Sequence, residues 1–149
     1  MTSCGEAPWK RCCVTARHSR LKRVDRAGAG TYLRKATEFF ESMQEAIPRS
    51  RWNASGLNAV HCAISACDAV LVYYTEQRSA SPDHETAAYL LSSLSKVPEA
   101  RKKAETLRKI IHEKHLIEYE DRSISQGEAV ELAKLTERFY RWAQEVLRA

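Results

Sequence analysis

Titratable side chains crowd into one short segment of the chain, residues 105–125, which reads ETLRKIIHEKHLIEYEDRSIS. An imidazole with a pKa of about 6.5 can exchange a proton at neutral pH, and a guanidinium can hold a phosphate group. Isoleucines and leucines lie between these groups, so the segment predicts either a polar site in a helical bundle or a solvated helix face. Its polar residues include Arg108, Lys109, His112, Lys114, His115, Glu118 and Tyr119.

Three of these residues form a possible catalytic set. Arg108, His112 and His115 are spaced by four and three residues, which places them on one helix face. A histidine there could move a 2′-hydroxyl proton while the arginine holds the phosphate, a combination that cleaves RNA without a metal ion. His112 and His115 could also be half of a metal site, but no carboxylate–histidine partner motif occurs on another helix, so we predict no metal. The sequence has no glycine-rich phosphate loop and no nucleophile elbow, and we predict no cofactor.

Two polar residues interrupt the apolar stripe of an earlier predicted helix. Asp68 follows His61 by seven residues and Ile64 by four, so both polar side chains should point inward. A buried carboxylate is costly unless it is paired. We therefore expect Asp68 to have a donor from another helix, for which the first helix and the cluster at 105–125 offer candidates. Asp68 and His61 are each interpreted as either a binding residue or a structural one.

Hydrophobic residues recur with helical spacing along most of the chain, and glycine and proline fall mainly between the periodic segments. No segment alternates with period two over the length of a strand. The pattern predicts an all-α fold, an up-and-down bundle of four to five helices with short loops. The expected helices span about 31–46 and 53–76, begin at Ser81–Pro82–Asp83 and near Pro98, and open with a capping box at Ser125–Glu128.

Charge divides the chain into two parts. Residues 1–29 hold seven basic and two acidic residues, whereas the 17 basic and 17 acidic residues of the remainder cancel. We expect 1–29 to be a basic, flexible tail able to bind phosphate backbones non-specifically, and 30–149 to be the helical domain. The odd number of cysteines, with Cys12 next to Cys13, favours a reducing cytoplasm over a disulfide framework. No run of 18 apolar residues occurs, so we expect no membrane span.

Three segments of the chain together resemble the HEPN superfamily (higher eukaryotes and prokaryotes nucleotide-binding) of small helical bundles. They are Tyr32–Ala36, Arg51–Ala69 and Lys114–Asp121, the last followed by the Ser125 capping box, and the resemblance covers about residues 31–147. Many members of that superfamily are metal-independent ribonucleases, often toxins or defence effectors, and they are typically dimeric. The resemblance therefore implies a homodimer, with a nucleotide, an RNA or an antitoxin-like protein as its partner.

The signature of the catalytic members is an arginine followed, after four to six residues, by a histidine. In the register we favour, Lys114 stands at the arginine position and Tyr119 at the histidine position, with Glu118 placed to order them, so the motif is degenerate. In a second register, Arg108 and His115 are separated by six residues and satisfy the signature. The first register implies a module that binds nucleotide, RNA or protein, as a component of a toxin–antitoxin or defence system. The second implies a metal-independent ribonuclease, and a purely structural interaction bundle is the third alternative.

Overall fold

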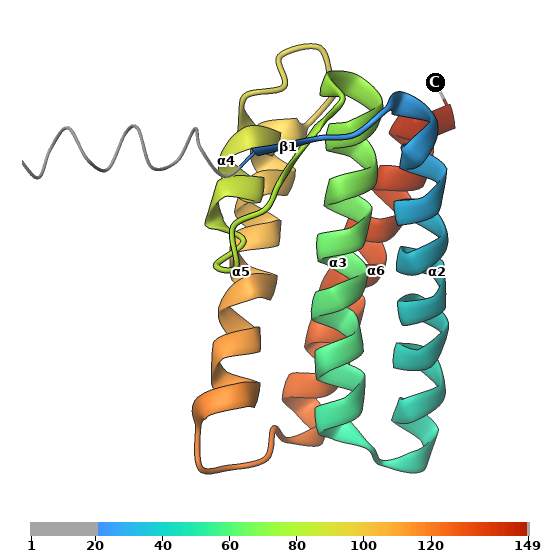
Figure 1. Ribbon diagram of the computed structural model, residues 1–149. Helices are drawn as coiled ribbons and strands as arrows, with labels where there is room; N and C mark the ends of the chain where they lie inside the picture. The colour runs from blue at the N-terminus through green and yellow to red at the C-terminus, as the bar shows by residue number, and fades with distance from the viewer. Residues whose placement is uncertain (1–20, 149) are drawn as a thin grey trace, which may run out of the picture.

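The structure, a computed structural model, describes residues 21–148. In this range four long helices and one short helix form an all-α bundle, and two three-residue strands lie at one end of it (Figure 1). Antiparallel neighbours joined by short connections make the bundle up-and-down, as the sequence predicted. The helices are α2 (Ala29–Ala46), α3 (Trp52–Thr75), α4 (Glu85–Ser92), α5 (Ala100–Tyr119) and α6 (Gln126–Arg148), with short 3-10 turns η1 (Arg26–Gly28) and η2 (Ile47–Arg49).

Helix α3 is the central element of the bundle. Its residues from Cys62 to Val72 are all buried, because α2, α4, α5 and α6 pack around it. By length and composition α3 could cross a membrane, but 78% of its most apolar window is buried inside the bundle. An element that is apolar on every side is typical of the core helix of a larger assembly of helices.

Helices α2 and α3 are antiparallel across the turn at Pro48, as predicted. Helix α6 closes the bundle on the other side of this pair. Its Tyr140 stacks on Phe40 of α2 with ring centroids 4.7 Å apart, and the Tyr140 hydroxyl lies 2.6 Å from Thr37 Oγ1. These contacts join the first and last helices of the domain.

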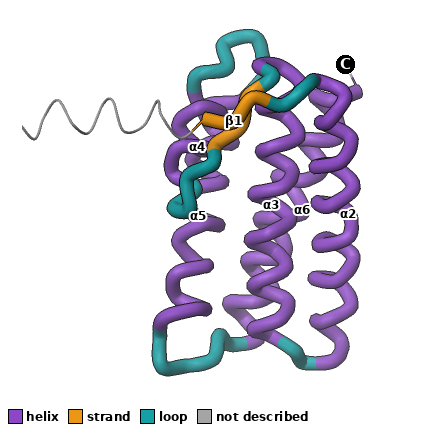
Figure 2. Tube along the Cα trace, in the orientation of Figure 1, coloured by secondary structure: helices purple, strands orange, loops and turns teal. Residues whose placement is uncertain are grey.

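The two strands, β1 (Leu21–Arg23) and β2 (Gln77–Ser79), were not predicted, because three residues are too few to show an alternating pattern (Figure 2). They pair antiparallel, with Lys22 opposite Arg78. The Val24 amide then donates to the Glu76 carbonyl at 2.9 Å. Residues 21–29, which the charge pattern assigned to the flexible tail, therefore have a defined place on the bundle. Residues 1–20 of that tail lie outside the described residues.

The start of α4 differs from the sequence prediction by three residues. Ser81 was expected to cap a helix with Pro82 at its first position, but α4 begins at Glu85. The Asp83 carboxylate explains the difference, because its Oδ1 accepts hydrogen bonds from Ser81 Oγ at 2.8 Å and from the Glu85 amide at 3.1 Å. Ser81 is thus used to position Asp83, whose side chain serves the first turn of the helix.

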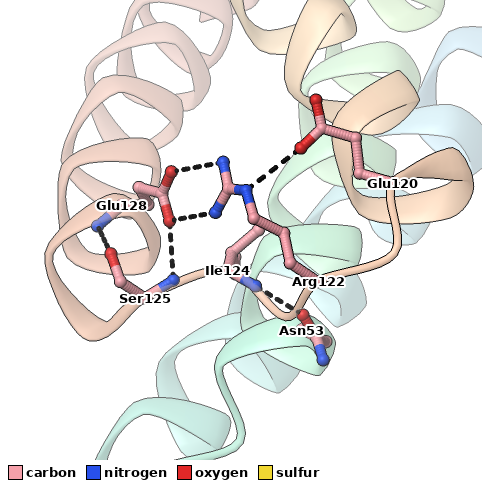
Figure 3. A network of polar contacts seen from close by, with 6 residues as sticks. All are labelled: Asn53, Glu120, Arg122, Ile124, Ser125 and Glu128. Atoms are coloured by element: carbon pink, nitrogen blue, oxygen red, sulfur yellow. Dashed lines mark hydrogen bonds and ion pairs between the residues drawn. The ribbon is translucent and has the colours of Figure 1, made fainter.

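The predicted capping box at the start of α6 is present. Ser125 Oγ accepts from the Glu128 amide at 3.2 Å, and Glu128 Oε2 accepts from the Ser125 amide at 2.7 Å (Figure 3). The Arg122 guanidinium binds both Glu128 oxygens, and together these donors lower the pKa of Glu128 to about 2. Asn53 Oδ1 accepts from the Ile124 amide at 3.0 Å, which fastens the α5–α6 connection to the start of α3.

Deletion experiments can test whether residues 21–28 belong to the folded domain. Removing residues 1–28 should lower the free energy of unfolding by about 1–3 kcal/mol more than removing residues 1–20, because the larger deletion also removes the β1–β2 pairing and the Val24–Glu76 hydrogen bond. Urea unfolding of the two truncated proteins measures the difference. Equal midpoints would show that the strand pair adds no stability and that the boundary at residue 29 holds.

Candidate functional site

Four of the predicted site residues meet at a cavity of about 260 Å³ between the end of α5 and the loop before α4. Lys114 Nζ lies 3.9 Å from Glu118 Oε2, a pairing one helical turn apart. The rings of His115 and Tyr119 lie 5.0 Å apart, and Tyr119 is 71% exposed. The favoured register thus gathers its residues at one place. The cavity is lined by Pro82, Asp83, His84, Ile111, Lys114, His115, Glu118 and Tyr119.

His61 lies on α3 close to the charged groups at this end of α5. Its half-buried ring stacks on Phe39 of α2, with ring centroids 5.2 Å apart. Burial lowers the pKa of His61, the positive charge of Lys114 lowers it further, and the negative charge of Glu118 opposes both. His61 is therefore neutral at pH 7, packed as an aromatic residue on one side and close to Lys114 on the other.

His84 is a member of this site that the sequence analysis did not single out. It occupies the position before α4 with a left-handed backbone, φ 59°, which is uncommon for a residue other than glycine. Burial lowers the pKa of His84, and the charge of Lys114 lowers it further. No sequence signal points to His84, because it lies in a loop about 30 residues before Lys114 and only the fold brings the two together.

The second register, Arg108 with His115, is not assembled within the chain. Arg108 forms ion pairs with Glu105 at 2.6 Å and with Glu85 of α4 at 3.6 Å, so its guanidinium is already paired with carboxylates. The seven-residue spacing sets Arg108 and His115 about 10 Å apart along the helix axis. His112 is exposed and lines a different groove, between α5 and α6. Arg108 also lines that groove, whereas His115 lines the cavity at the end of α5, so the possible catalytic set is divided between two surfaces.

Asp68 is buried as predicted, with 6% of its surface exposed, but its partner was predicted wrongly. The donor comes from β2 and not from another helix, since Arg78 Nη1 donates to Asp68 Oδ2 at 3.3 Å. The chain turns back after α3, which carries Arg78 over the aspartate, and the guanidinium also lies 5.4 Å from the centre of the Tyr32 ring. Asp68 does not line the cavity at the end of α5. Its contacts join α3, β2 and α2, which is a structural role.

Burial raises the pKa of Asp68 to about 6, although the Arg78 and Lys35 charges lower it. The unfavourable effect of removing this carboxylate from water thus exceeds the favourable effect of its two cationic neighbours on the charged form.

Burial also raises the pKa of the Cys62 thiol to about 12, so this cysteine acts as an apolar core residue. Among residues 21–148, no group of three histidine, cysteine or carboxylate side chains is placed to hold a metal ion.

Comparison with known proteins places most of the chain in one family. A family model described as the HEPN domain matches residues 29–146, which spans α2 to α6. None of the curated proteins compared with the chain matches it. The family match covers the whole bundle and includes the cavity at the end of α5.

Proposed function

The chain belongs to the HEPN domain family, and from this membership we propose that it binds the phosphate of a nucleotide or of RNA and lacks strong ribonuclease activity. The observation that carries the proposal is the cavity at the end of α5, where Lys114 stands among the His84, His115 and Tyr119 side chains. Within it Lys114 is the permanent cation, because the pKa of His84 is lowered and that side chain is neutral at pH 7.

The cavity offers separate contacts for the two parts of a nucleotide. Lys114 Nζ is held only loosely, 3.9 Å from Glu118, and can donate to a phosphate oxygen. The Tyr119 ring is mostly exposed, so a base can stack on its face. We propose that phosphate binds at Lys114 and that the adjacent base stacks on Tyr119, with His115 holding the tyrosine ring by its own ring contact.

The same groups are poorly suited to cleave RNA. A tyrosine hydroxyl, with a pKa of about 10, is a weak base at neutral pH. Arg108, the only arginine of the second register, is bound by Glu85 and Glu105. In our proposal the protein is a homodimer to which α3 and α5 contribute, with the cavities near the interface, and it serves as a component of a toxin–antitoxin or defence system.

A binding experiment tests the phosphate site. Fluorescein-labelled single-stranded RNA should bind the wild-type protein, and Lys114→Ala should weaken binding about tenfold through loss of one charge-assisted contact. Tyr119→Ala should weaken it to a similar degree, whereas Tyr119→Phe should retain most of the affinity because it keeps the ring. Fluorescence anisotropy measures the affinities. Lys102→Ala, which removes an exposed lysine at the far end of α5, is the matched control.

The same proteins can be tested for cleavage in the presence of EDTA. We expect wild-type protein to leave the RNA intact, or to give a trace of cleavage that His115→Ala does not change. If the wild-type protein cleaves RNA, and Arg108→Ala or His115→Ala abolishes the cleavage while circular dichroism is unchanged, the ribonuclease hypothesis replaces our proposal. RNA affinity equal in wild type and Lys114→Ala would reject the phosphate site. Light scattering of the wild-type protein tests the dimer separately.

A further inference from the structure

A second hollow lies on another side of α5, between α5 and α6, and the proposed phosphate site does not use it. We call it the α5–α6 groove; its volume is about 840 Å³. Leu116 of α5 and Leu132 and Leu135 of α6 supply its apolar lining, with Leu132 only 5% exposed. Charged side chains surround these leucines, among them Arg108, Lys109, Glu113, Glu128, Glu131 and Arg138.

The groove has the size of a short helix. Along α6 it extends from Gly127 to Arg138, which is about 16 Å at the rise of an α-helix. Helices α5 and α6 are antiparallel and joined at one end (Figure 1). Lys109 precedes the end of α5 by 10 residues and Arg138 follows the start of α6 by 12, so the helical rise places both at about the same height, away from the α5–α6 connection. Gly127 lines the opposite end, where a Cβ would meet only the Ser125 hydroxyl, at 3.9 Å. Two to three turns of helix would fit this length.

Only some of the charged side chains around the groove already form ion pairs. Glu128 is bound by Arg122, Glu131 by Lys134, and Arg108 by Glu85 and Glu105. Among the described residues, Lys109 and Arg138 take part in none of the ion pairs that the structure forms. Glu113 is the one carboxylate lining the groove that also forms no ion pair among the described residues. The end of the groove at Lys109 and Arg138 therefore carries two cations that are available to an acidic partner.

A second copy of the chain is a poor match for this groove. Filling a hollow requires apolar side chains that protrude, and two copies facing each other through their grooves would enclose an empty space. In the described part of the chain the large hydrophobic residues that are exposed are Tyr89 and Tyr119. Neither lines the groove, so the same face of another copy has no large apolar side chain to insert.

We propose that the α5–α6 groove binds an amphipathic helix of a partner protein, with apolar side chains on the three leucines and acidic side chains beside Lys109 and Arg138. Such a helix would present anchors at positions i, i+3 or i+4, and i+7, the usual arrangement for a helix in a groove. The leucines supply the buried contact area, and the two cations fix the direction in which the helix lies. This site is independent of the phosphate site.

A pair of synthetic peptides tests the proposal. Both are fluorescein-labelled amphipathic helices of about 12 residues, a length of about 18 Å, with leucines at the anchor positions; one carries glutamates at one end and the other carries lysines there. We expect the wild-type protein to bind the acidic peptide at least tenfold more tightly than the basic one in anisotropy titrations. The double variant Lys109→Glu/Arg138→Glu should reverse this preference, because both changes are at exposed positions. Leu135→Gln should weaken binding of both peptides.

The outcomes separate the proposal from its alternatives. Equal binding of the two peptides, or a preference that the charge reversal leaves unchanged, would overturn it, as would failure of the acidic peptide to bind the wild-type protein at millimolar concentration. Light scattering that shows a dimer dissociated by Leu135→Gln would assign the groove to a second copy instead. Circular dichroism and the thermal midpoint of the charge-reversed variant confirm that the fold is intact. Lys114→Ala should bind the peptides as the wild type does, which keeps this test separate from that of the phosphate site.

Discussion

Between pH 4 and pH 7 the free energy of unfolding of the wild-type protein should fall by about 2.5 kcal/mol relative to that of Asp68→Asn. Burial raises the pKa of Asp68 from 3.8 to about 6, and each pKa unit corresponds to about 1.4 kcal/mol. In this window the folded state binds the proton more tightly than the unfolded state. The stabilisation is therefore complete below the unfolded pKa and is lost as the pH rises through the folded pKa.

Urea unfolding of both proteins at several pH values measures this difference, in which the contributions of the other carboxylates cancel. Asparagine keeps an acceptor for Arg78 but does not titrate, so it isolates the charge. Asp68→Ala at pH 7 should be less stable than the wild type by about 1–3 kcal/mol, because the Arg78 guanidinium, whose side chain is 26% exposed, loses its acceptor. If the difference in free energy of unfolding between the wild type and Asp68→Asn stays constant with pH, then the Arg78 charge fully offsets the effect of burial on the pKa of Asp68.

Features set by local sequence were predictable in this chain. The capping box of Ser125 and Glu128 needs only four consecutive residues, and the inward direction of Asp68 follows from the periodicity of α3. The partner of Asp68 was not predictable, because Arg78 reaches it through a turn and a strand of three residues. Three residues are too few to show a periodic pattern, so the sequence does not indicate that the chain turns back over Asp68.

The candidate site was predictable in part for the same reason. Lys114, His115, Glu118 and Tyr119 lie within two turns of one helix, so their meeting at one cavity follows from their spacing. His84 lines the cavity only because the loop before α4 lies against the end of α5, and no local sequence pattern predicts that contact. Spacing also misled, since Arg108 and His112 share a helix with His115 but line the α5–α6 groove, where Arg108 also pairs with Glu85 of α4.

Replacing Phe139 by alanine should lower the free energy of unfolding by about 3–5 kcal/mol, the largest loss we expect from a single change. The Phe139 side chain is fully buried, and its ring lies 5.4 Å from that of Trp142. Truncation would leave a cavity next to Trp142, whose Nε1 donates to the Pro98 carbonyl at 3.0 Å just before α5 begins. The loss would thus loosen the attachment of α5 to α6 as well as the core.

Phe139→Leu is the matched control, and it should cost less than about 1.5 kcal/mol because it fills most of the same volume. Urea unfolding of the two variants measures both losses.

If Phe139 acts through Trp142 on the position of α5, the double variant Phe139→Ala/Trp142→Phe should lose less stability than the sum of the two single variants, because the effects of substitutions at contacting residues are not additive. Peptide affinity in the α5–α6 groove should fall in Phe139→Ala under conditions where the protein stays folded. Additive stability losses with unchanged peptide affinity would show that the Phe139 contact supports the core alone and that other contacts set the spacing of α5 and α6.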